Sequence, residues 1–396
     1  MSFPDGQSTV SLRREDDTTR QPRVKEVGFS QTALAHHWLV TMGGGEKVLE
    51  QFSELFPNAP IYTLVATKDR LSRQLQRHEI IPSAFGRLPG AAWMYKQALP
   101  LFPLAFGTLK ISGKPALVLS SDASMIKGIA VPPGAPHVCF CHSPPRYLWD
   151  AQATHSLPHG AGSVLLKAIT PALRRWDRAA AQRVDFFIAN SQFIRERIRV
   201  AYGRESEVIN PPVAVEDFAP LSGAPDDFYL VVSRLVPYKR IDIAIEAFGR
   251  LGKRLVVIGD GSEYKRLRKG AGRNIEFLGA QPFRVLRDHY ARCRALIFPG
   301  VEDFGITPLE AQASGRPVIA FGKGGALETV KPGETGLFFD GQSGECLASA
   351  VTEFESRSWD AARCRSNALR FGAARFRSEI SAFLRRHGLP SGGATP

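Results

Sequence analysis

Two glutamates, Glu302 and Glu310, stand eight residues apart in the segment VEDFGITPLEAQA at 301–313. An apolar stretch at Ala295–Pro299 predicts a strand just before them, so Glu302 is expected at the carboxyl end of that strand. Carboxylates there face the cleft of an α/β domain, where one could accept hydrogen bonds from a ribose and the other from a sugar hydroxyl. For Glu310 a structural alternative stays open, because Thr307 and Glu310 have the spacing of a capping box.

Two cations, Arg234 and Lys239, follow a second predicted strand at Phe228–Ser233. They belong to the segment SRLVPYKR, in which a turn containing Pro237 separates them. Two fixed cations in a cleft suit a diphosphate, because arginine can bind two oxygens at once and lysine acts as a point charge. The alternative interpretation is a solvated basic loop.

Two glycine turns connect predicted strands to predicted helices, MGGGE at Met42–Glu46 and FGKGGALE at Phe321–Glu328. Such turns present backbone N–H groups at a helix N-terminus and could let a diphosphate approach the backbone closely. A tight connection between a strand and a helix would use the same residues. The first turn does not match G-x-G-x-x-G, which argues against a nicotinamide-dependent enzyme.

The elements that must position these residues alternate between strands and helices, which predicts parallel sheets covered on both faces. In the first half we expect strands at Gln31–His36, Ile61–Val65, Ala116–Ser120, His137–Cys141 and Phe186–Asn190, and helices at Glu46–Leu55, Leu165–Arg183 and Phe193–Tyr202. In the second half we expect strands at Phe228–Ser233, Arg254–Gly259, Ile275–Phe277, Ala295–Pro299, Pro317–Ala320 and Gly336–Phe339, and helices at Ile241–Leu251, from Ser262, at Pro308–Ser314 and at Ala361–His387. The predicted fold class is α/β, with two facing doubly wound domains and a cleft between their strand ends.

A linker rich in Pro, Gly and Asp at Asn210–Asp227 separates the two halves. Two domains are also the expectation from length, because 396 residues exceed one ordinary core. We expect a disordered tail at 1–28, an N-terminal acceptor-binding domain at 29–212, a C-terminal nucleotide-sugar domain at 213–370, and at 371–396 a helix that returns to the N-terminal domain, followed by a tail.

Together and in order, these segments resemble the family 4 retaining glycosyltransferases, whose two facing Rossmann-like domains form the GT-B fold. The resemblance extends over about residues 31–340 and rests on GGGEKVLE at 43–50, CHSPPRYLWD at 141–150, NS at 190–191, SRLVPYKR at 233–240, GDGSE at 259–263 and EDFGITPLEA at 302–311. The N-terminal motifs are similar to those of a bacterial polysaccharide mannosyltransferase branch. The resemblance implies transfer of a hexose to a lipid-linked or polysaccharide-precursor acceptor, from GDP-mannose in first place or from a UDP-sugar, without a metal or a cofactor.

For the donor nucleotide, the resemblance implies that Arg234 and Lys239 hold the diphosphate with the backbone of Gly44 and Gly45. Glu310 corresponds to the ribose-binding glutamate. The other donor contacts implied are the backbone of Phe304, Gly305 and Ile306, and Asp260 with Gly261 at the edge of the base pocket.

Near the transferred sugar, the resemblance places Glu302 and His142, which with Arg234 and Lys239 form the implied catalytic set. A hydrogen-bonded histidine at a strand end is the structural alternative for His142. One position departs from the branch: relatives commonly have His-Asp-Trp-Leu near the start, whereas this chain has His-His-Trp-Leu at 36–39, so an aspartate role at His37 is in doubt.

The formal charge of +13 and the sequence pI near 9.7 suggest an anionic partner, for which nucleic acid, an anionic membrane surface and a phosphorylated small substrate are the candidates. The chain lacks a nucleic-acid motif with aromatic platforms, so a membrane surface is favoured over nucleic acid. Trp93–Leu109 combines aromatics, leucines and prolines, and it could face a lipid-linked acceptor or belong to the core. With no apolar run of spanning length and no signal-like N-terminus, we expect a cytoplasmic protein that contacts the inner face of the plasma membrane.

Other interpretations remain open for the function and for the cysteines. An epimerase or a phosphorylase of the same fold would act on related substrates, and a non-catalytic glycan- or membrane-binding subunit would keep the fold without the reaction. The five cysteines have no framework spacing and are expected to be free thiols. Cys139 and Cys141 flank Phe140, and we interpret them as positions on a buried strand rather than metal ligands.

Overall fold

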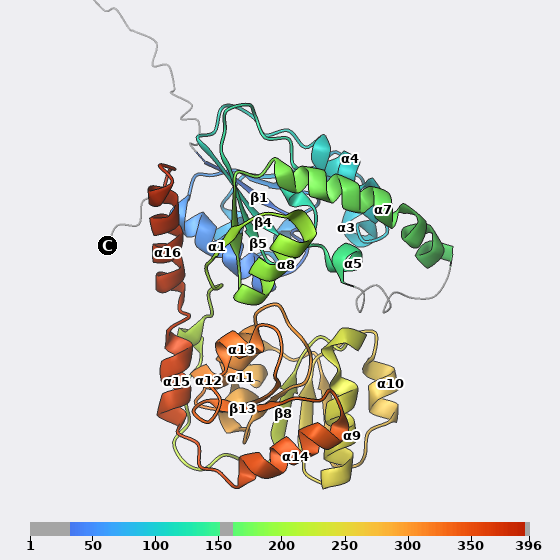
Figure 1. The fold of residues 1–396 in the computed structure, drawn as a ribbon, viewed down its shortest axis with the longest axis vertical. Coiled ribbons are helices and arrows are strands. Elements are labelled where there is room, and N and C mark those ends of the chain that lie inside the picture. The colour runs from blue at the N-terminus through green and yellow to red at the C-terminus, as the bar shows by residue number, and fades with distance from the viewer. Residues whose placement is uncertain (1–31, 151–160, 393–396) are drawn as a thin grey trace, which may run out of the picture.

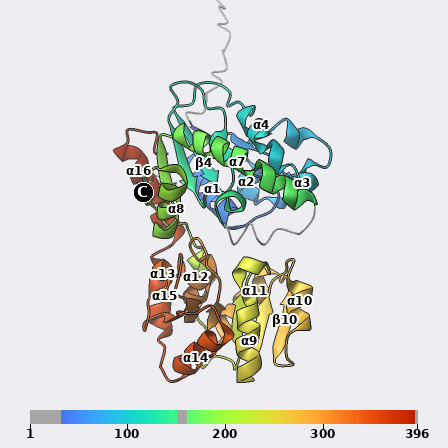
Figure 2. The ribbon, with the colours of Figure 1, turned by 45° about the vertical axis from the view of Figure 1, so that its right-hand side comes forward.

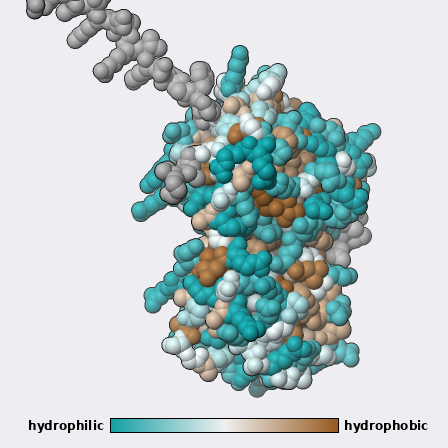
Figure 3. All heavy atoms as spheres, turned by 60° about the vertical axis from the view of Figure 1, so that its left-hand side comes forward, coloured by the Kyte–Doolittle hydropathy of each residue, from teal (hydrophilic) through white to brown (hydrophobic). Residues whose placement is uncertain are grey.

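The computed structural model describes residues 32–150 and 161–392. Figure 1 shows two α/β lobes stacked along the long axis, and Figure 3 shows that the surface narrows between them. The chain passes from the first sheet to the second between Val208 and Tyr229. The predicted pair of facing, doubly wound domains is therefore confirmed.

The N-terminal sheet has seven parallel strands in the order β3-β2-β1-β4-β5-β6-β7. Side chains alternate between its faces: Leu34 packs with α1, and Ala33 and Ala35 pack towards α4 and α7. The strands are β1 (Thr32–His36), β2 (Ile61–Thr63), β3 (Ile80–Pro82), β4 (Leu117–Asp122), β5 (His137–Cys141), β6 (Phe186–Ala189) and β7 (Ser206–Val208). The helices are α1 (Gly44–Leu55), α2 (Arg73–Gln76), α3 (Ala91–Met94), α4 (Phe102–Gly107), α5 (Arg146–Trp149), α7 (Ala161–Gln182) and α8 (Gln192–Tyr202), with the short turns η1 (Lys68–Arg70), η2 (Phe85–Arg87), η3 (Leu99–Leu101) and η4 (Ile126–Gly128).

The C-terminal sheet has six parallel strands in the order β10-β9-β8-β11-β12-β13. Val231 and Val257 pack towards α9 and α14, whereas Leu230 and Val256 pack towards α12 and α15. The strands are β8 (Tyr229–Val232), β9 (Leu255–Ile258), β10 (Ile275–Gly279), β11 (Leu296–Phe298), β12 (Val318–Phe321) and β13 (Gly336–Phe339). The helices are α9 (Ile241–Leu251), α10 (Tyr264–Lys269), α11 (Phe283–Arg292), α12 (Ile306–Ala313), α13 (Ala326–Thr329), α14 (Gly344–Glu355) and α15 (Ala361–Leu369), with the turns η5 (Val215–Asp217) and η6 (Pro237–Lys239).

The single helix predicted at Ala361–His387 is wrong, because the structure has two helices that meet at Gly372. Phe371 accepts a hydrogen bond from the amide of Val213 at 2.9 Å, which ties the break to the linker. The second helix, α16 (Ala373–Arg386), lies on the N-terminal lobe in Figure 1, where Phe376 stacks on Phe52 of α1. The two helices therefore cover different lobes: α15 packs on α12 of the C-terminal lobe, and α16 packs on α1 of the N-terminal lobe.

Both sheets reverse their strand order at the first strand of the domain. In the N-terminal sheet β1 lies between β2 and β4, and in the C-terminal sheet β8 lies between β9 and β11. Ligands of doubly wound domains bind beyond the carboxyl ends of the strands at such a switch point. The residues that follow β1, β4, β8 and β11 are therefore expected nearest to a ligand.

A fully buried ion triad lies at the carboxyl end of β4. The Nζ of Lys127 lies 3.1 Å from Asp122 Oδ2 and 2.6 Å from Asp177 Oδ1, and all three side chains are inaccessible to solvent. Asp177 also accepts hydrogen bonds from Trp149 Nε1 at 2.7 Å and Tyr202 at 2.8 Å. Burial acts against the charge of Lys127, but the two carboxylates raise its pKa well above the usual value. The triad joins β4, the η4 turn and α7.

Candidate active site

A cleft of about 440 Å³ lies between the two lobes and is lined by both. Its lining comes mainly from the loops after β1, β8 and β11, as the strand order predicts, with Ala123, His142 and Asn190 from the loops after β4, β5 and β6. Most of the predicted site residues meet there, namely Gly44, Gly45, His142, Arg234, Lys239, Glu302, Phe304, Gly305 and Ile306.

The cations of the cleft come from the loop after β8. Arg234 is exposed, and its guanidinium makes no ion pair within residues 32–150 and 161–392. Lys239 ends the short turn η6 and contacts the carboxylate of Glu302. Burial, together with the charges of Arg146 and Arg234, lowers the pKa of Lys239 to about 7, against the opposing effect of Asp303. An anion entering the cleft would relieve this mutual repulsion of cations.

The loop that carries Glu302 is held from behind by a glycine turn. Gly325 donates its amide to the Glu302 carbonyl at 2.9 Å, and a side chain there would place its Cβ 2.2 Å from Phe304 backbone atoms. The turn at Phe321–Glu328 is absent from the cleft lining. Of its two interpretations, the structure supports the tight connection, because the turn packs against Glu302–Phe304.

Glu310 lies on α12, and its predicted alternative as a capping residue is wrong. The helix begins at Ile306 after Gly305, and no side chain of the described residues caps it. The Glu310 carboxylate instead accepts a hydrogen bond from the Tyr290 hydroxyl at 2.7 Å. Burial raises the pKa of Glu310. Tyr290 therefore orients this carboxylate, although Glu310 is not among the residues that line the cleft.

Asp260 and Gly261 also lie outside the cleft lining. The Asp260 carbonyl accepts the amide of Leu235 at 2.9 Å, and Asp260 Oδ1 accepts the amide of Gly261 at 2.7 Å. This segment therefore supports the loop that carries Arg234. Its assignment to a base pocket stays a prediction.

Across the cleft, the glycine turn before α1 lies against the C-terminal lobe. A Cβ on Gly44 would come within 2.8 Å of Ile306 Cδ1, so glycine lets the two lobes approach at this point. The N-terminus of α1, a helix of 12 residues, thus opens beside Gly305 and Ile306. Its free N–H groups and dipole favour an anion there.

His142 follows β5 and forms part of a group of imidazoles at the cleft. Its Nε2 lies 2.8 Å from Ser121 Oγ, which also lies 3.0 Å from His36 Nδ1. Burial lowers the pKa of His142 to about 3, and the neighbouring His37 and His36 act in the same direction. His142 is therefore neutral at pH 7 and can act by hydrogen bonding, not as a fixed charge.

Polar contacts join the two lobes beside the cleft. Asp303, between Glu302 and Phe304, pairs with Arg146 at 2.9 Å, and its carbonyl accepts the Ser191 hydroxyl at 2.6 Å. Glu328 Oε1 accepts the amide of Gln192 at 2.8 Å, which places a carboxylate at the N-terminus of α8. These contacts set the separation at which residues of the two lobes face each other.

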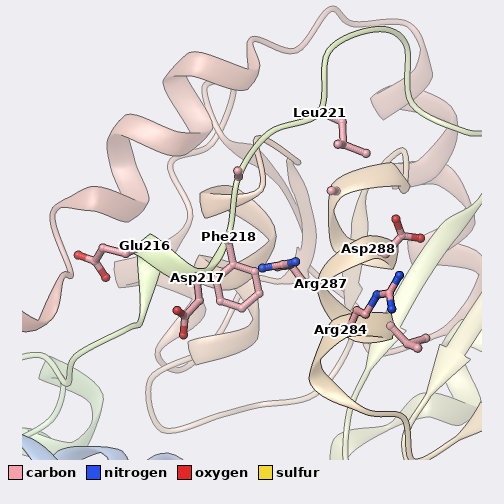
Figure 4. Close-up of a pocket in the computed structure, with 10 residues that line it drawn as sticks. Glu216, Asp217, Phe218, Leu221, Arg284, Arg287 and Asp288 are labelled. Carbon is pink, nitrogen blue, oxygen red and sulfur yellow. The ribbon is translucent and has the colours of Figure 1, made fainter.

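A larger cavity, about 700 Å³, lies between the linker and α11 and shares no residue with the cleft. Figure 4 shows Arg284, Arg287 and Asp288 of α11 beside Phe218 and Leu221 of the linker. This cavity is lined by the linker and the C-terminal lobe, and none of its lining residues follows the carboxyl end of a sheet strand. The cleft is therefore the better candidate for catalysis.

Sequence reasoning missed four residues that shape the site: Ser121, Glu46, Asp303 and Tyr290. Ser121 belongs to a serine pair at the end of β4, and Asp303 stands directly beside Glu302, so both lay near recognisable signals. Tyr290 lies 20 positions from Glu310 on a helix that the sequence pattern did not reveal. Its role depends on packing between helices and left no local signal.

Comparison with known families covers both lobes. Residues 42–217 match the model Glycosyltransferase Family 4, and residues 215–371 match the model Glycosyl transferases group 1. A GDP-mannose-dependent alpha-(1-6)-phosphatidylinositol monomannoside mannosyltransferase of Mycobacterium tuberculosis is 31% identical over 232 residues, which are 51% of this chain and 59% of the relative. A D-inositol 3-phosphate glycosyltransferase of Kribbella flavida is 29% identical over 214 residues, 46% of this chain and 50% of that one. The matches thus span between 50% and 59% of the length of these relatives.

Solved structures agree on the fold. Sucrose-phosphate synthase from Thermosynechococcus elongatus has a TM-score of 0.69 at 17% identity and covers 90% of this chain and 99% of its own. HepE of Anabaena in complex with UDP has a TM-score of 0.65 at 18% identity, covering 89% of this chain and 100% of its own. With both lobes matched by family models, the chain belongs to the family 4 glycosyltransferases of GT-B fold, with a group 1 domain as its second half.

Proposed function

We propose that this protein is a retaining, metal-independent glycosyltransferase that moves a hexose from a nucleotide sugar to a lipid-linked or polysaccharide-precursor acceptor. The observation that carries the proposal is the convergence of positive potential on one cleft from both lobes. Arg234 has no anionic partner among the described residues, Lys239 lies beside it, and the N-terminus of α1 opens opposite. GDP-mannose is the favoured donor, because the mycobacterial relative is named as dependent on it.

In the proposed reaction the bond between the anomeric carbon and a phosphate oxygen breaks, and negative charge grows on the leaving diphosphate. Arg234 and Lys239 stabilise that charge, and each such group is worth about 3 kcal/mol of barrier in comparable sites. The acceptor oxygen attacks on the face that the leaving group vacates, which retains the anomeric configuration. Its proton passes to the departing phosphate oxygen. Glu302 and the neutral His142 hold the hydroxyls of the transferred sugar.

Donor choice can be tested by thermal shift with GDP-, UDP- and ADP-sugars, each with and without EDTA. We expect GDP-mannose to give the largest rise in Tm and EDTA to leave it unchanged. A ligand at 100 times its Kd stabilises the folded state by about 2.7 kcal/mol. The same samples with a lipid-linked acceptor distinguish the alternatives: an epimerase converts the donor without acceptor, and a binding subunit forms no product. Failure of every donor to bind would contradict the proposal.

We further propose that the N-terminal lobe meets its acceptor at the inner face of the plasma membrane. The segment Trp93–Leu109 has both buried and exposed apolar side chains. Phe102 and Phe106 are buried, whereas Trp93 is 80% and Leu104 67% exposed. With Leu88, Met94 and Leu101, which are also exposed, Trp93 and Leu104 form what we call the apolar patch. Both Figure 1 and Figure 2 place α3, α4 and α7 together on one side of this lobe.

Charge around the apolar patch supports an anionic lipid surface. From Ile80 to Ser121 the chain has no Asp or Glu, and its basic residues there are all exposed: Arg87, Lys96, Lys110 and Lys114. Exposed apolar side chains flanked by lysines and arginines are typical of proteins that lie on anionic bilayers. None of the helices in the described ranges is long and apolar enough to cross a bilayer.

Replacing Trp93 and Leu104 together by serine should weaken binding to vesicles of phosphatidylglycerol. Each large side chain contributes about 2 kcal/mol when buried, so the loss in a sedimentation assay should exceed tenfold. Val200, 69% exposed on α8, provides the matched control, and Val200→Ser should bind as the parent does. High salt should also weaken the binding of the parent protein to these vesicles. Failure of the parent to bind anionic vesicles at low salt would refute the membrane proposal.

A further inference from the structure

Four polar side chains form a line from Glu46 in the first turn of α1 to His142 after β5, and both ends of the line border the cleft. Glu46 Oε1 lies 3.6 Å from His36 Nε2, His36 Nδ1 lies 3.0 Å from Ser121 Oγ, and Ser121 Oγ lies 2.8 Å from His142 Nε2. His36 and Ser121 are completely buried, and Glu46 is nearly so. His142 is half-buried and lines the cleft.

The register of the sheet brings these residues together. His36 of β1 stands directly opposite Ser121 of β4, so their side chains share a face. Ser121 also stands opposite Phe140 of β5, and His142 lies two positions further on the same face. Ser120 points to the other face, where its hydroxyl lies 2.8 Å from His137 Nε2. The strand β4 thus carries two serine–histidine pairs, one facing the cleft and one away from it.

The position of each proton follows from the donors and acceptors available. Burial lowers the pKa of His36 to about 3 despite the charge of Asp122, and His142 is neutral for the same main reason. Each ring therefore has one N–H and one bare nitrogen. His36 Nε2 is buried, has no hydrogen-bond partner among the described residues, and faces Glu46. A carboxylate repels a bare nitrogen, so Nε2 carries the hydrogen and Nδ1 is bare.

The single hydrogen of the Ser121 hydroxyl fixes the direction of the other two hydrogen bonds. The bare Nδ1 of His36 accepts the hydroxyl hydrogen of Ser121, which is the one hydrogen that this hydroxyl has. Ser121 Oγ can then only accept from His142, so His142 Nε2 must be its donor. The nitrogen left over on His142 is a bare Nδ1. A nitrogen of this kind accepts a hydrogen bond and cannot donate one.

We infer that Ser121 and His36 are positioning residues that hold His142 as the Nε2–H tautomer, so that His142 offers a hydrogen-bond acceptor to a sugar hydroxyl. The sugar as ligand rests on the proposed function, whereas the tautomer rests on the contacts alone. The carbonyl of Ser121 extends the arrangement, since it lies 3.3 Å from His37 Nδ1. A carbonyl only accepts, so His37 carries its hydrogen on Nδ1. Both imidazoles that line the cleft then present a bare nitrogen.

The tautomers can be measured in the full-length protein with 15N-labelled histidine, independently of activity. Bare and protonated ring nitrogens differ widely in 15N shift, and His142→Gln identifies the resonances of His142. We expect a protonated Nε2 and a bare Nδ1 at pH 7. In Ser121→Ala the ring loses its partner, and the two nitrogens should move towards averaged values. A bare Nε2 in the parent would overturn the inference.

Activity provides the second readout, with Ser120→Ala as the matched control. Both substitutions remove a buried hydroxyl from β4 that bonds an imidazole, so their effects on stability should be similar. Ser121→Ala should lower kcat/KM about tenfold, the worth of one hydrogen bond, and Ser121→Thr should restore most of it. Ser120→Ala should leave kcat/KM unchanged. Equal losses in both alanine variants would show a structural role only and would overturn the inference. Absence of transfer in the parent would count against the proposed function and leave the NMR result standing.

Discussion

Replacing Arg234 by alanine is expected to lower kcat/KM for sugar transfer by about a thousandfold. The guanidinium has no ion pair in the described structure and lines the cleft, so its charge is free for a diphosphate. Loss of the charge and of the paired hydrogen bonds should destabilise the transition state more than the bound donor, because the leaving group is most negative in the transition state. A fall in kcat larger than the rise in KM is therefore expected from steady-state kinetics with GDP-mannose.

The same substitution should leave the fold intact, because Arg234 is exposed and its guanidinium makes no hydrogen bond or ion pair with the residues that the structure describes. Arg234→Lys keeps the charge but loses the paired hydrogen bonds of the guanidinium. Its kcat/KM should therefore lie between those of the parent and of Arg234→Ala. Arg250→Ala is the control. Arg250 pairs with Glu246 on the surface of α9, so its replacement should leave kcat/KM and the free energy of unfolding almost unchanged. Near-normal transfer by Arg234→Ala would remove Arg234 from the proposed mechanism.

The sequence predicted those elements whose apolar pattern is strong. The bounds of α9, β5 and β13 agree with the prediction, because each is bordered by turn residues and buried along its length or on one face. The helix α11 was missed because Tyr290 and Ala291 are its only buried residues in a polar sequence. The edge strands β3 and β7 are three residues long, too short for an alternating pattern to be seen.

Most of the cleft could be predicted because position at a strand end is a local property. Arg234, Glu302 and His142 each follow a recognisable strand, and the parallel arrangement then brings them to one edge. The bonds of Ser121 could not be predicted, because they depend on the pairing of β1 with β4 across 85 positions of sequence. The sequence therefore indicates which residues reach the cleft, while the register decides which residues orient them.

Replacing Lys127 by methionine is expected to lower the free energy of unfolding by about 3–5 kcal/mol. Methionine fills similar space, but it leaves Asp122 and Asp177 buried without their cation. Asp177 would keep its bonds from Trp149 and Tyr202, so the side chains should hold their places while the charge is left unbalanced. Thermal unfolding should show a fall of roughly 10 °C or more. Lys331→Met, which breaks the exposed pair with Glu334, should cost less than about 1 kcal/mol.

The pH dependence of this difference provides a further check. In the parent, burial raises the pKa of Asp122, but Lys127 and the Ser124 amide outweigh it and the pKa is lowered. A lowered pKa contributes stability above the unfolded value of about 3.9, and that stability is lost as the pH falls through the folded value. Without Lys127 the main group that opposes burial is lost, although the Ser124 amide still donates to Asp122, so the folded pKa of Asp122 rises. The variant is therefore destabilised most at a pH where this carboxylate must be ionised. The gap between parent and variant should therefore be larger at pH 8 than at pH 5. A gap that stays constant over this range would mean that Lys127 stabilises the lobe by packing and not by its charge.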